Sequence, residues 1–233
     1  FDVCGAMSQG YIGYHMQQGL EKVLRARKNG KRVVTVVTQV VVDKDDPKFK
    51  APSKPIGPFY TEDEARKLEA EKGYTMKEDA GRGWRRVVAS PMPVEIVELD
   101  AVKCLMNGGF IAITVGGGGI PVIKDENGNY IGTAAVIDKD LASERLAEDI
   151  DADALVILTA VEQVCINFGK PEQKSLATMT VEEARRYMAE GHLLPKVEAA
   201  VKFVESKPGR KAIITSLDKA VEALEGKAGT TVC

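Results

Sequence analysis

Residues 33–42 constrain the fold more than any other part of this sequence. β-branched residues dominate the segment, and its apolar character is almost unbroken. A strand with one wet face alternates between apolar and polar residues, whereas a strand covered on both faces does not. We therefore predict a central strand of a sheet, buried on both sides.

The segments that follow alternate between helical and strand patterns. Such alternation predicts α/β layering. Asn127 and Gly128 predict a type I′ turn in a hairpin between residues 122–123 and 130–131. The expected helices cover residues 7–28, 62–71, 98–106, 141–149, 181–189 and 196–205, with a short helix from Leu217, and the other expected strands cover residues 110–115, 154–158 and 212–215.

Residues 43–93 differ in composition from the rest of the chain. They are more charged and richer in proline, and they hold one amphipathic helix, at residues 62–71. We predict one α/β domain made of residues 1–42 and 94–233, with residues 43–93 forming an inserted, protruding, lid-like subdomain.

Composition excludes several classes of function. The chain has 233 residues, 44% of them hydrophobic, and no apolar run long enough to cross a bilayer, so we expect a soluble protein with a sizeable core and no membrane partner. Its 32 basic and 34 acidic residues give a formal charge of -2, which argues against nucleic acid as a partner. The four scattered cysteines show no metal-ligand spacing and indicate reduced thiols in the cytoplasm.

Four consecutive glycines, residues 116–119, directly follow the predicted strand at 110–115. Ordering four glycines in a loop with no other role would cost much conformational entropy. Close approach of a ligand to the backbone is therefore the better explanation for them. The segment is not a Walker loop, because no Gly-Lys-Ser or Gly-Lys-Thr follows. We assign Gly117, Gly118 and Gly119 to substrate binding.

Asp138, Lys139 and Asp140 lie where a helix is expected to begin. A lysine between carboxylates suits phosphate chemistry, with Asp138 holding the Lys139 ammonium in place. The alternative is that both aspartates cap the helix and that Lys139 is solvated.

Lys196 follows Pro195 at another expected helix start, where the helix dipole alone does not favour a cation. A nearby anion would explain it, and a snorkelling surface lysine is the alternative.

The order and spacing of several motifs resemble those of carbamate kinases, members of the amino-acid-kinase superfamily. The resemblance covers the whole chain and implies a three-layer α/β/α sandwich. In that family the insert closes over the site, so Gly81 and Gly83 are expected to permit movement at its base. The motifs are residues 54–60, 78–85, 116–121, 134–140 and 195–200.

The resemblance also implies the reaction and its participants. Phosphoryl transfer between carbamoyl phosphate and ADP would give ATP and carbamate, with Mg²⁺ on the nucleotide, in arginine breakdown and in a homodimer. Lys139 and Lys54 would stabilise the transferred phosphoryl group, and Asp138 would orient Lys139. The residues implied for the nucleotide are Lys196, at its phosphates, and Thr159, Val161 and Phe168, at the nucleotide-binding edge.

Two other functions remain open. One is a kinase for another carboxylate, such as an N-acetylated amino acid, although the insert carrying Lys54 argues against it. The other is a non-catalytic remnant that binds a nucleotide or carbamoyl phosphate. Measuring ATP formation and phosphate transfer to each acceptor separates the two kinases. Ligand binding without turnover would identify the remnant.

The sequence departs from the family pattern in three places. It lacks the family's Gly-Gly-Asn-Ala and Gly-Asn-Gly-Pro loops, and the join at residues 190–196 is short. We therefore expect the natural protein to be heavier than 25.2 kDa. Ala160 stands where many relatives have aspartate, so its side chain offers no polar contact to a nucleotide.

Overall fold

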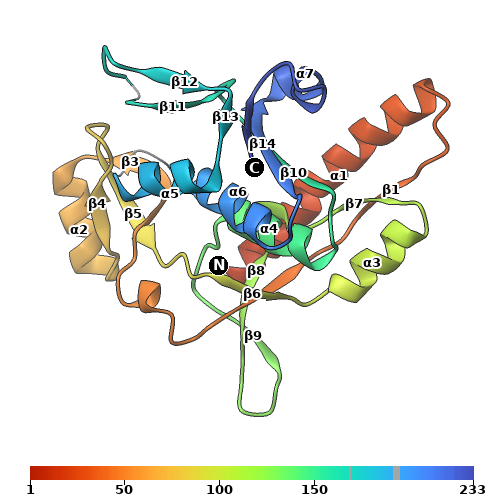
Figure 1. Cartoon of the computed structure of the whole chain (residues 1–233). Coiled ribbons are helices and arrows are strands. Elements are labelled where there is room, and N and C mark those ends of the chain that lie inside the picture. Colours follow the sequence, from red (N-terminus) through yellow and green to blue (C-terminus); the bar gives the residue numbers. More distant parts are fainter. Residues whose placement is uncertain (168, 191–194) are drawn as a thin grey trace. The chain divides into compact units, whose positions relative to one another are not determined.

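The computed structural model describes residues 1–167, 169–190 and 195–233 and consists of two compact units (Figure 1). Unit 1 is Phe1–Ala142 and unit 2 is Ser143–Cys233, so the division falls inside helix α4 (Lys139–Asp149). Helices and strands alternate in both units, which confirms the α/β prediction. This boundary is not among those predicted from the sequence, which lie at residues 42–43 and 93–94.

The segment predicted as one central strand is two strands. β1 (Val33–Thr35) pairs in parallel with β7 (Ile111–Ile113), and β2 (Gln39–Val42) pairs in parallel with β8 (Ile120–Lys124). Four residue steps separate Thr35 from Gln39, but seven separate their partners Ile113 and Ile120. The glycines between β7 and β8 take up the difference, and so the pairing is interrupted there.

The second half of the predicted strand is central and buried, as expected. β2 lies between β6 (Pro93–Ile96) and β8 in a sheet of order β6-β2-β8-β9. Val40, Val41 and Val42 are at most 6% exposed, and Val41 packs with Ile120 and Val122. Apolar burial here fixes the position of the strand beside the glycines.

Helix α1 (Asp2–Ala26) forms close to the predicted place, but several of its large apolar residues lie outside the face that it buries. Met7, Tyr11 and Tyr14 are all more than half exposed, whereas Gln9 and Gly13 are buried. Gly13 is required because an added Cβ would collide with Thr35 of β1. Close packing of helix on strand, and not apolar content, therefore decides which face is inside.

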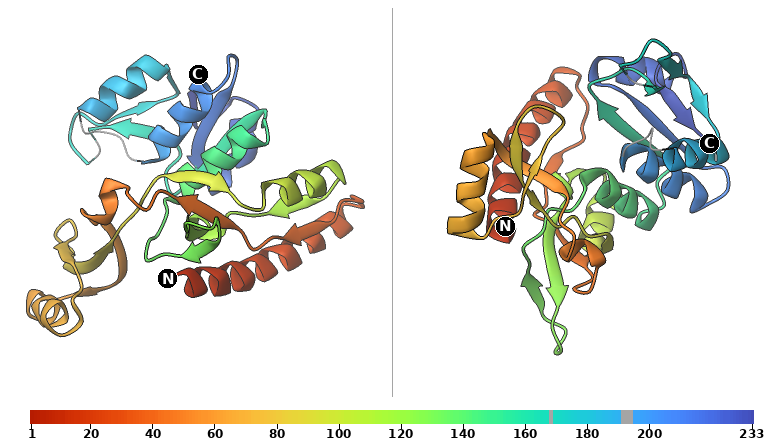
Figure 2. Two further views of the ribbon diagram at one scale, coloured as in Figure 1. Left: turned by 90° about the horizontal axis from the view of Figure 1, so that it is seen from below. Right: turned by 90° about the vertical axis from the view of Figure 1, so that its left-hand side faces the viewer.

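The segment 43–93 contains its own three-stranded sheet, of order β3-β5-β4. This sheet and α2 (Glu62–Lys72) stand apart from sheet β6-β2-β8-β9 (Figure 2, left). Thr61 and Glu64 form a reciprocal capping box at the start of α2. The strands are β3 (Lys54–Tyr60), β4 (Met76–Glu78) and β5 (Trp84–Val88).

Asp46 fastens the two ends of this segment to each other. Its carboxylate accepts hydrogen bonds from Lys48 N (2.8 Å) and Met92 N (2.9 Å), at the entry and the exit. Gly81 and Gly83 lie instead in the turn between β4 and β5, where both have positive φ. The glycines expected at the base of the insert are therefore turn residues.

The hairpin of β8 and β9 (Tyr130–Gly132) is present as predicted, but its turn is not type I′ (Figure 1). Gly128 has φ +82, whereas Asn127 is not among the residues with positive φ, which type I′ requires at both central positions. Asp125 organises the turn by accepting hydrogen bonds from the amides of Asn127 (2.9 Å) and Asn129 (2.7 Å).

Unit 2 has a four-stranded sheet, of order β10-β14-β15-β13, and a separate hairpin of β11 and β12. α6 (Pro195–Glu205) packs on β14 (Lys211–Ser216), and its Phe203 is fully buried. Helix α5 (Val181–Ala189) matches its predicted bounds. The other strands are β10 (Ala154–Thr159), β11 (Val164–Ile166), β12 (Lys174–Leu176), β13 (Thr178–Met179) and β15 (Thr230–Val232).

The remaining elements are short. Unit 1 also has α3 (Leu99–Asn107) and the 3₁₀ turns η1 (Pro47–Phe49) and η2 (Gly116–Gly118). Unit 2 also has η3 (Leu217–Lys219) and α7 (Ala220–Leu224), at the helix expected from Leu217. Among the described helices, none has the length and apolar character that crossing a membrane requires. All four cysteines are free.

Candidate active site

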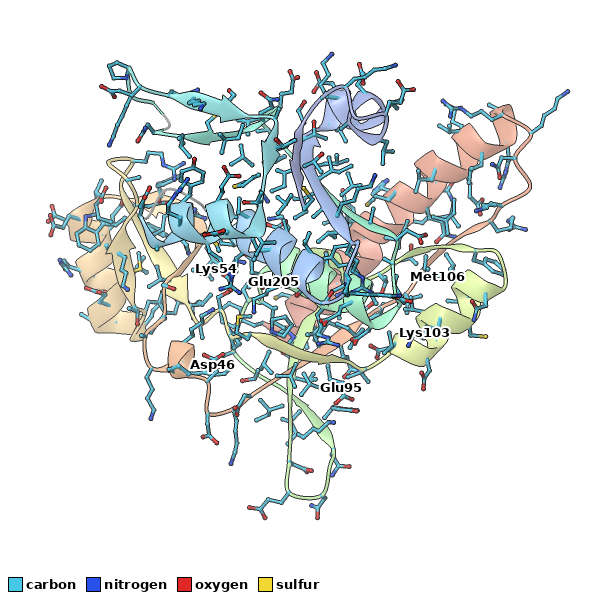
Figure 3. All side chains as sticks on the ribbon, in the orientation of Figure 1. Asp46, Lys54, Glu95, Lys103, Met106 and Glu205 are labelled. Carbon is cyan, nitrogen blue, oxygen red and sulfur yellow. The ribbon has the colours of Figure 1, made fainter. Side chains whose placement is uncertain are left out.

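Lys54 and Asp138 form an ion pair within unit 1. Lys54 is the first residue of β3, and its Nζ lies 3.1 Å from Asp138 Oδ2 and 3.3 Å from the carbonyl oxygen of Ile137. Its side chain is 25% exposed, and that of Asp138 is 17% exposed. The inserted sheet thus presents a half-buried ammonium to the start of α4; Figure 3 labels Lys54.

Both carboxylate oxygens of Asp138 have structural partners. While Oδ2 binds Lys54, Oδ1 accepts a hydrogen bond from Asp140 N (2.9 Å), as a helix N-cap does. Burial opposes ionisation of Asp138, but the Lys54 charge and the hydrogen bonds from Lys54, Asp140 N and Leu141 N outweigh it. The pKa of Asp138 therefore lies below its ordinary value.

Lys139 has a different environment from the one expected. Its side chain is 63% exposed, and its Nζ lies 3.8 Å from Asp140 Oδ2. Asp138, the residue expected to orient Lys139, pairs with Lys54 instead. Lys139 therefore lies in the first turn of α4 with most of its side chain exposed to solvent.

The glycine turn (residues 116–119) lies against the same backbone. A Cβ added at Gly118 would collide with the carbonyl oxygen of Ile137, which also accepts from Lys54. Gly118 has φ +102 and Gly119 has φ +84, conformations that favour glycine. Gly117 has open space around the position of a Cβ. Lys54, Asp138 and the glycine turn therefore form one cluster.

A buried polar network that the sequence analysis did not identify holds the glycine turn. Gln9 of α1 donates from Nε2 to Gly116 O (3.0 Å) and to Thr38 O (3.1 Å), and accepts from Thr38 N (2.8 Å). The signal in the sequence was the spacing of Gln9, Gly13 and Gln17, which places two amides and a glycine on one helical face.

The residues expected to bind the nucleotide lie in unit 2. Thr159 ends β10 beside Ser216, the last residue of β14, and the exposed Val161 follows. The carboxyl ends of parallel strands are a common ligand site in α/β proteins. Lys196 is a half-buried residue in the first turn of α6. Phe168 lies outside the described residues.

Thr230 fixes the base of the β11–β12 hairpin near these residues. Its hydroxyl accepts from Val164 N (2.8 Å) and donates to Leu176 O, and Gln163 Nε2 donates to Gly229 O (3.2 Å). Thr230 is fully buried. The hairpin that follows Val161 is therefore anchored to β15 at both of its ends.

Among the described residues, no group of three His, Cys, Asp or Glu side chains could hold a metal ion. Asp138 has one oxygen on Lys54 and the other on the Asp140 amide. Mg²⁺ usually binds one or two carboxylates, substrate phosphates and several waters. These residues therefore do not form a protein cage for Mg²⁺.

Comparison with known proteins decides the family. A profile of the amino acid kinase family matches residues 48–216, which include Lys54, Asp138 and Lys196. A carbamate kinase of Clostridium perfringens (strain 13 / Type A) is 57% identical over 237 residues, covering 100% of this chain and 75% of that protein. The chain belongs to the amino acid kinase family, within its carbamate kinases.

Two further relatives support this membership of the carbamate kinases. The carbamate kinase-like protein YqeA of Escherichia coli (strain K12) is 57% identical, over 99% of this chain and 76% of that protein. The structure of the carbamate kinase from Giardia lamblia bound to AMP-PNP matches with a TM-score of 0.87 and 46% identity, over 99% of this chain and 74% of that one. The fold of this family member is therefore the mixed α/β amino-acid-kinase fold.

Proposed function

We propose that this carbamate kinase family member transfers a phosphoryl group reversibly between carbamoyl phosphate and ADP, giving ATP and carbamate. The half-buried Lys54–Asp138 pair beside the glycine turn is the observation that carries the proposal. Phosphoryl transfer needs fixed positive charge and backbone donors at the transferring oxygens, with little covalent chemistry from the protein. Unit 1 supplies the fixed positive charge through Lys54, and its glycine turn lets a substrate approach the backbone closely.

Lys54 and Lys139 are assigned to the phosphoryl group of carbamoyl phosphate. In ATP formation an oxygen of the ADP β-phosphate attacks phosphorus, and the bond from phosphorus to the carbamate oxygen breaks. Negative charge spreads over the transferring oxygens, and the two ammonium groups stabilise it. Asp138 keeps Lys54 in place through the 3.1 Å contact, so little reorganisation is needed during transfer.

Gly117, Gly118 and Gly119 are assigned to the same substrate. The collision that a side chain at Gly118 would cause shows how closely the turn approaches the Ile137 carbonyl. Carbamate is itself anionic and nucleophilic in the reverse direction, so no general base is needed. The cluster therefore acts through position and charge.

ADP and ATP are assigned to Thr159, Val161, Lys196 and Phe168 of unit 2. The strand ends at Thr159 and Ser216 support this assignment, as does the structure of a relative that binds the nucleotide analogue AMP-PNP. Mg²⁺ is proposed to arrive with the nucleotide phosphates, since the described residues lack a cage for it. When bound, it would neutralise phosphate charge.

We further propose a homodimer. Val3, Met7, Tyr11 and Tyr14 form an apolar stripe on α1, opposite the buried Gln9 and Gly13, and each member is more than half exposed. Contiguous exposed apolar surface commonly marks a protein interface. Light scattering of the natural protein should give twice the chain mass, and Tyr11→Glu should lower it to one chain mass. An unchanged mass would contradict the role of this stripe.

A cytoplasmic location and a place in arginine breakdown complete the proposal. Four free cysteines suit a reducing compartment. The place in metabolism rests on family membership.

The test of the function is ATP formation from ADP, Mg²⁺ and carbamoyl phosphate by the full-length natural protein. In parallel, ATP consumption is measured with carbamate and with N-acetylated amino acids as acceptors. Turnover with carbamoyl phosphate and carbamate alone is the expected result. Turnover with an N-acetylated amino acid would identify the other kinase, and ADP binding without any turnover would identify a binding remnant.

A further inference from the structure

Gln9 is a buried polar residue of α1, and the hydrogen bonds of its side chain reach parts of unit 1 that are distant in sequence. It is 5% exposed. Its amide nitrogen bonds Gly116 O at 3.0 Å and Thr38 O at 3.1 Å, and its amide oxygen bonds Thr38 N at 2.8 Å. A buried amide satisfied in this way links α1, the start of β2 and the glycine turn.

Thr38 continues the link. It is fully buried, and its hydroxyl donates to Val36 O or Thr114 Oγ1 (2.8 Å each) and accepts from Val115 N (3.1 Å). Its carbonyl also accepts from Ile120 N (2.9 Å), at the far end of the glycine turn. Gln9 and Thr38 together therefore hold residues on both sides of the turn.

The turn needs such support because its backbone is strained at Val115. Val115 has φ +54, which is rare and unfavourable for a β-branched residue. Such strain persists only where surrounding contacts enforce it. Here the enforcing contacts are the bond from Val115 N to Thr38 and the bond from Gly118 N to Val115 O (3.0 Å).

The supported turn reaches the proposed phosphoryl site directly. Gly118 contacts Ile137 O, the carbonyl that also accepts from Lys54 Nζ. Gly119 N also bonds Gly116 O at 3.1 Å, so a shift of Gly116 would disturb the turn that holds Gly118. Gln9 is therefore connected to the proposed phosphoryl site through the glycine turn, from Gly116 to Gly118.

We infer that Gln9, acting through Gly116 and Thr38, is a positioning residue that sets the glycine turn for the phosphoryl group. The inference rests on the proposed function. Misplacement of a catalytic group by about 1 Å can cost about a hundredfold in rate. Loss of the Gln9 amide should therefore act on carbamoyl phosphate and leave ADP, assigned to unit 2, largely unaffected.

Gln17 provides a matched control two helical turns along α1. Its Oε1 accepts from Thr35 N and Thr35 Oγ1, each at 3.1 Å, so it fastens the same helix to β1 and not to the glycine turn. Gln9→Met and Gln17→Met each replace an amide with an unbranched side chain of similar length. If the substitutions simply loosen α1, both variants lose activity. If Gln9 positions the glycine turn, only Gln9→Met loses activity.

The experiment measures kcat and KM for both substrates in the full-length natural protein and the two variants, together with amide hydrogen exchange. We expect Gln9→Met to lower kcat/KM for carbamoyl phosphate tenfold or more, to leave the KM for ADP within twofold, and to speed exchange at Gly118, Gly119 and Ile120. Gln17→Met should leave these quantities within twofold. Equal losses in the two variants, or wild-type exchange and kinetics in Gln9→Met, would overturn the inference.

If Gln9→Met does not fold, a second pair of variants tests the Thr38 part of the network through which Gln9 acts. Thr38→Val removes the hydroxyl that accepts from Val115 N, whereas Thr38→Ser keeps it. A lower kcat/KM for carbamoyl phosphate in Thr38→Val, with the wild-type value in Thr38→Ser, supports positioning. Equal kcat/KM values in the two variants contradict it. If the wild-type protein shows no turnover, the proposed function fails, and the exchange rates at Gly118 and Gly119 still test whether Gln9 holds the turn.

Discussion

Asp138 binds the Lys54 ammonium with one carboxylate oxygen and the amide of Asp140 with the other. One side chain therefore joins the inserted sheet to the start of α4 and caps that helix. Both partners favour the ionised carboxylate, which is why its pKa is lowered in spite of burial. The ion pair thus stabilises the contact between β3 and the start of α4, and it also holds the Lys54 charge that the proposed reaction uses.

Asp138→Asn should reduce stability in a pH-dependent way. Asparagine still caps a helix, so the substitution mainly removes the charge opposite Lys54. Because the folded-state pKa is lowered, this stabilisation is present above the ordinary aspartate pKa of about 3.9 and is lost as pH falls through the folded value. Urea unfolding should show a loss of about 1–2 kcal/mol at neutral pH, between typical values for exposed and buried pairs. The same loss at about pH 3 would contradict this origin.

Lys139→Ala should separate activity from stability. The Lys139 side chain is mostly exposed, and its Nζ lies 3.8 Å from Asp140 Oδ2. We expect the free energy of unfolding to stay within about 0.5 kcal/mol of wild type, as for most surface substitutions. We expect kcat to fall by about a hundredfold or more, as on removal of an electrostatic donor. Unchanged kcat would show that Lys139 is merely solvated.

Asp46→Ala should loosen the base of the inserted segment (Figure 3). The Asp46 carboxylate accepts hydrogen bonds from the backbone amides of Lys48 and Met92, and both bonds are charge-assisted. Loss of a hydrogen bond to a charged group costs about 1.5–3 kcal/mol, so exchange of these two amides should accelerate tenfold or more. Asp45→Ala, at an exposed neighbouring residue, is the control. Equal exchange in the two variants would show that Asp46 does not fasten the segment.

Glu144→Gln should stabilise unit 2 at alkaline pH. Burial, and then the charge of Glu148, raise the pKa of Glu144 to about 7, although Lys202 and Arg145 act in the opposite direction. A raised folded-state pKa contributes stability that is fully present below the unfolded pKa of about 4.3 and is lost as pH rises through about 7.

The urea midpoint of Glu144→Gln should therefore exceed that of wild type at about pH 8 and approach it at about pH 4. Glu182→Gln, at an exposed residue of α5, is the control and should match wild type at both values. A constant difference between Glu144→Gln and wild type across this range would contradict the assigned titration.

The elements of the fold could largely be predicted from the sequence, because local signals specify them. The periodic pattern of residues 181–189 gives α5 with the correct bounds, and the strand patterns around Asn127 and Gly128 give the β8–β9 hairpin. The split of residues 33–42 could not be predicted from that segment. It depends on the extra residues that the glycine turn adds to the partner strand.

The candidate site was predictable as a set of residues but not as a set of contacts. The charge pattern singled out Asp138 and Lys139, yet the partner of Asp138 is Lys54, which is distant in sequence. Apolar spacing likewise predicted α1, but Met7 and Tyr11 of that pattern are exposed, whereas Gln9, on the opposite face of the helix, is buried. Tertiary hydrogen bonds decide both cases, and they leave little trace in local composition.

The most direct measurement of the central claim compares Lys54→Met with Lys77→Met in ATP formation from carbamoyl phosphate and ADP. Both lysines lie in sheet β3-β5-β4, but Lys77 is exposed, whereas Lys54 binds Asp138 and Ile137 O. The electrostatic role predicts that kcat/KM falls by about a hundredfold or more in Lys54→Met and stays within about twofold of wild type in Lys77→Met. Activity retained in Lys54→Met would contradict the assignment of this ion pair to phosphoryl transfer.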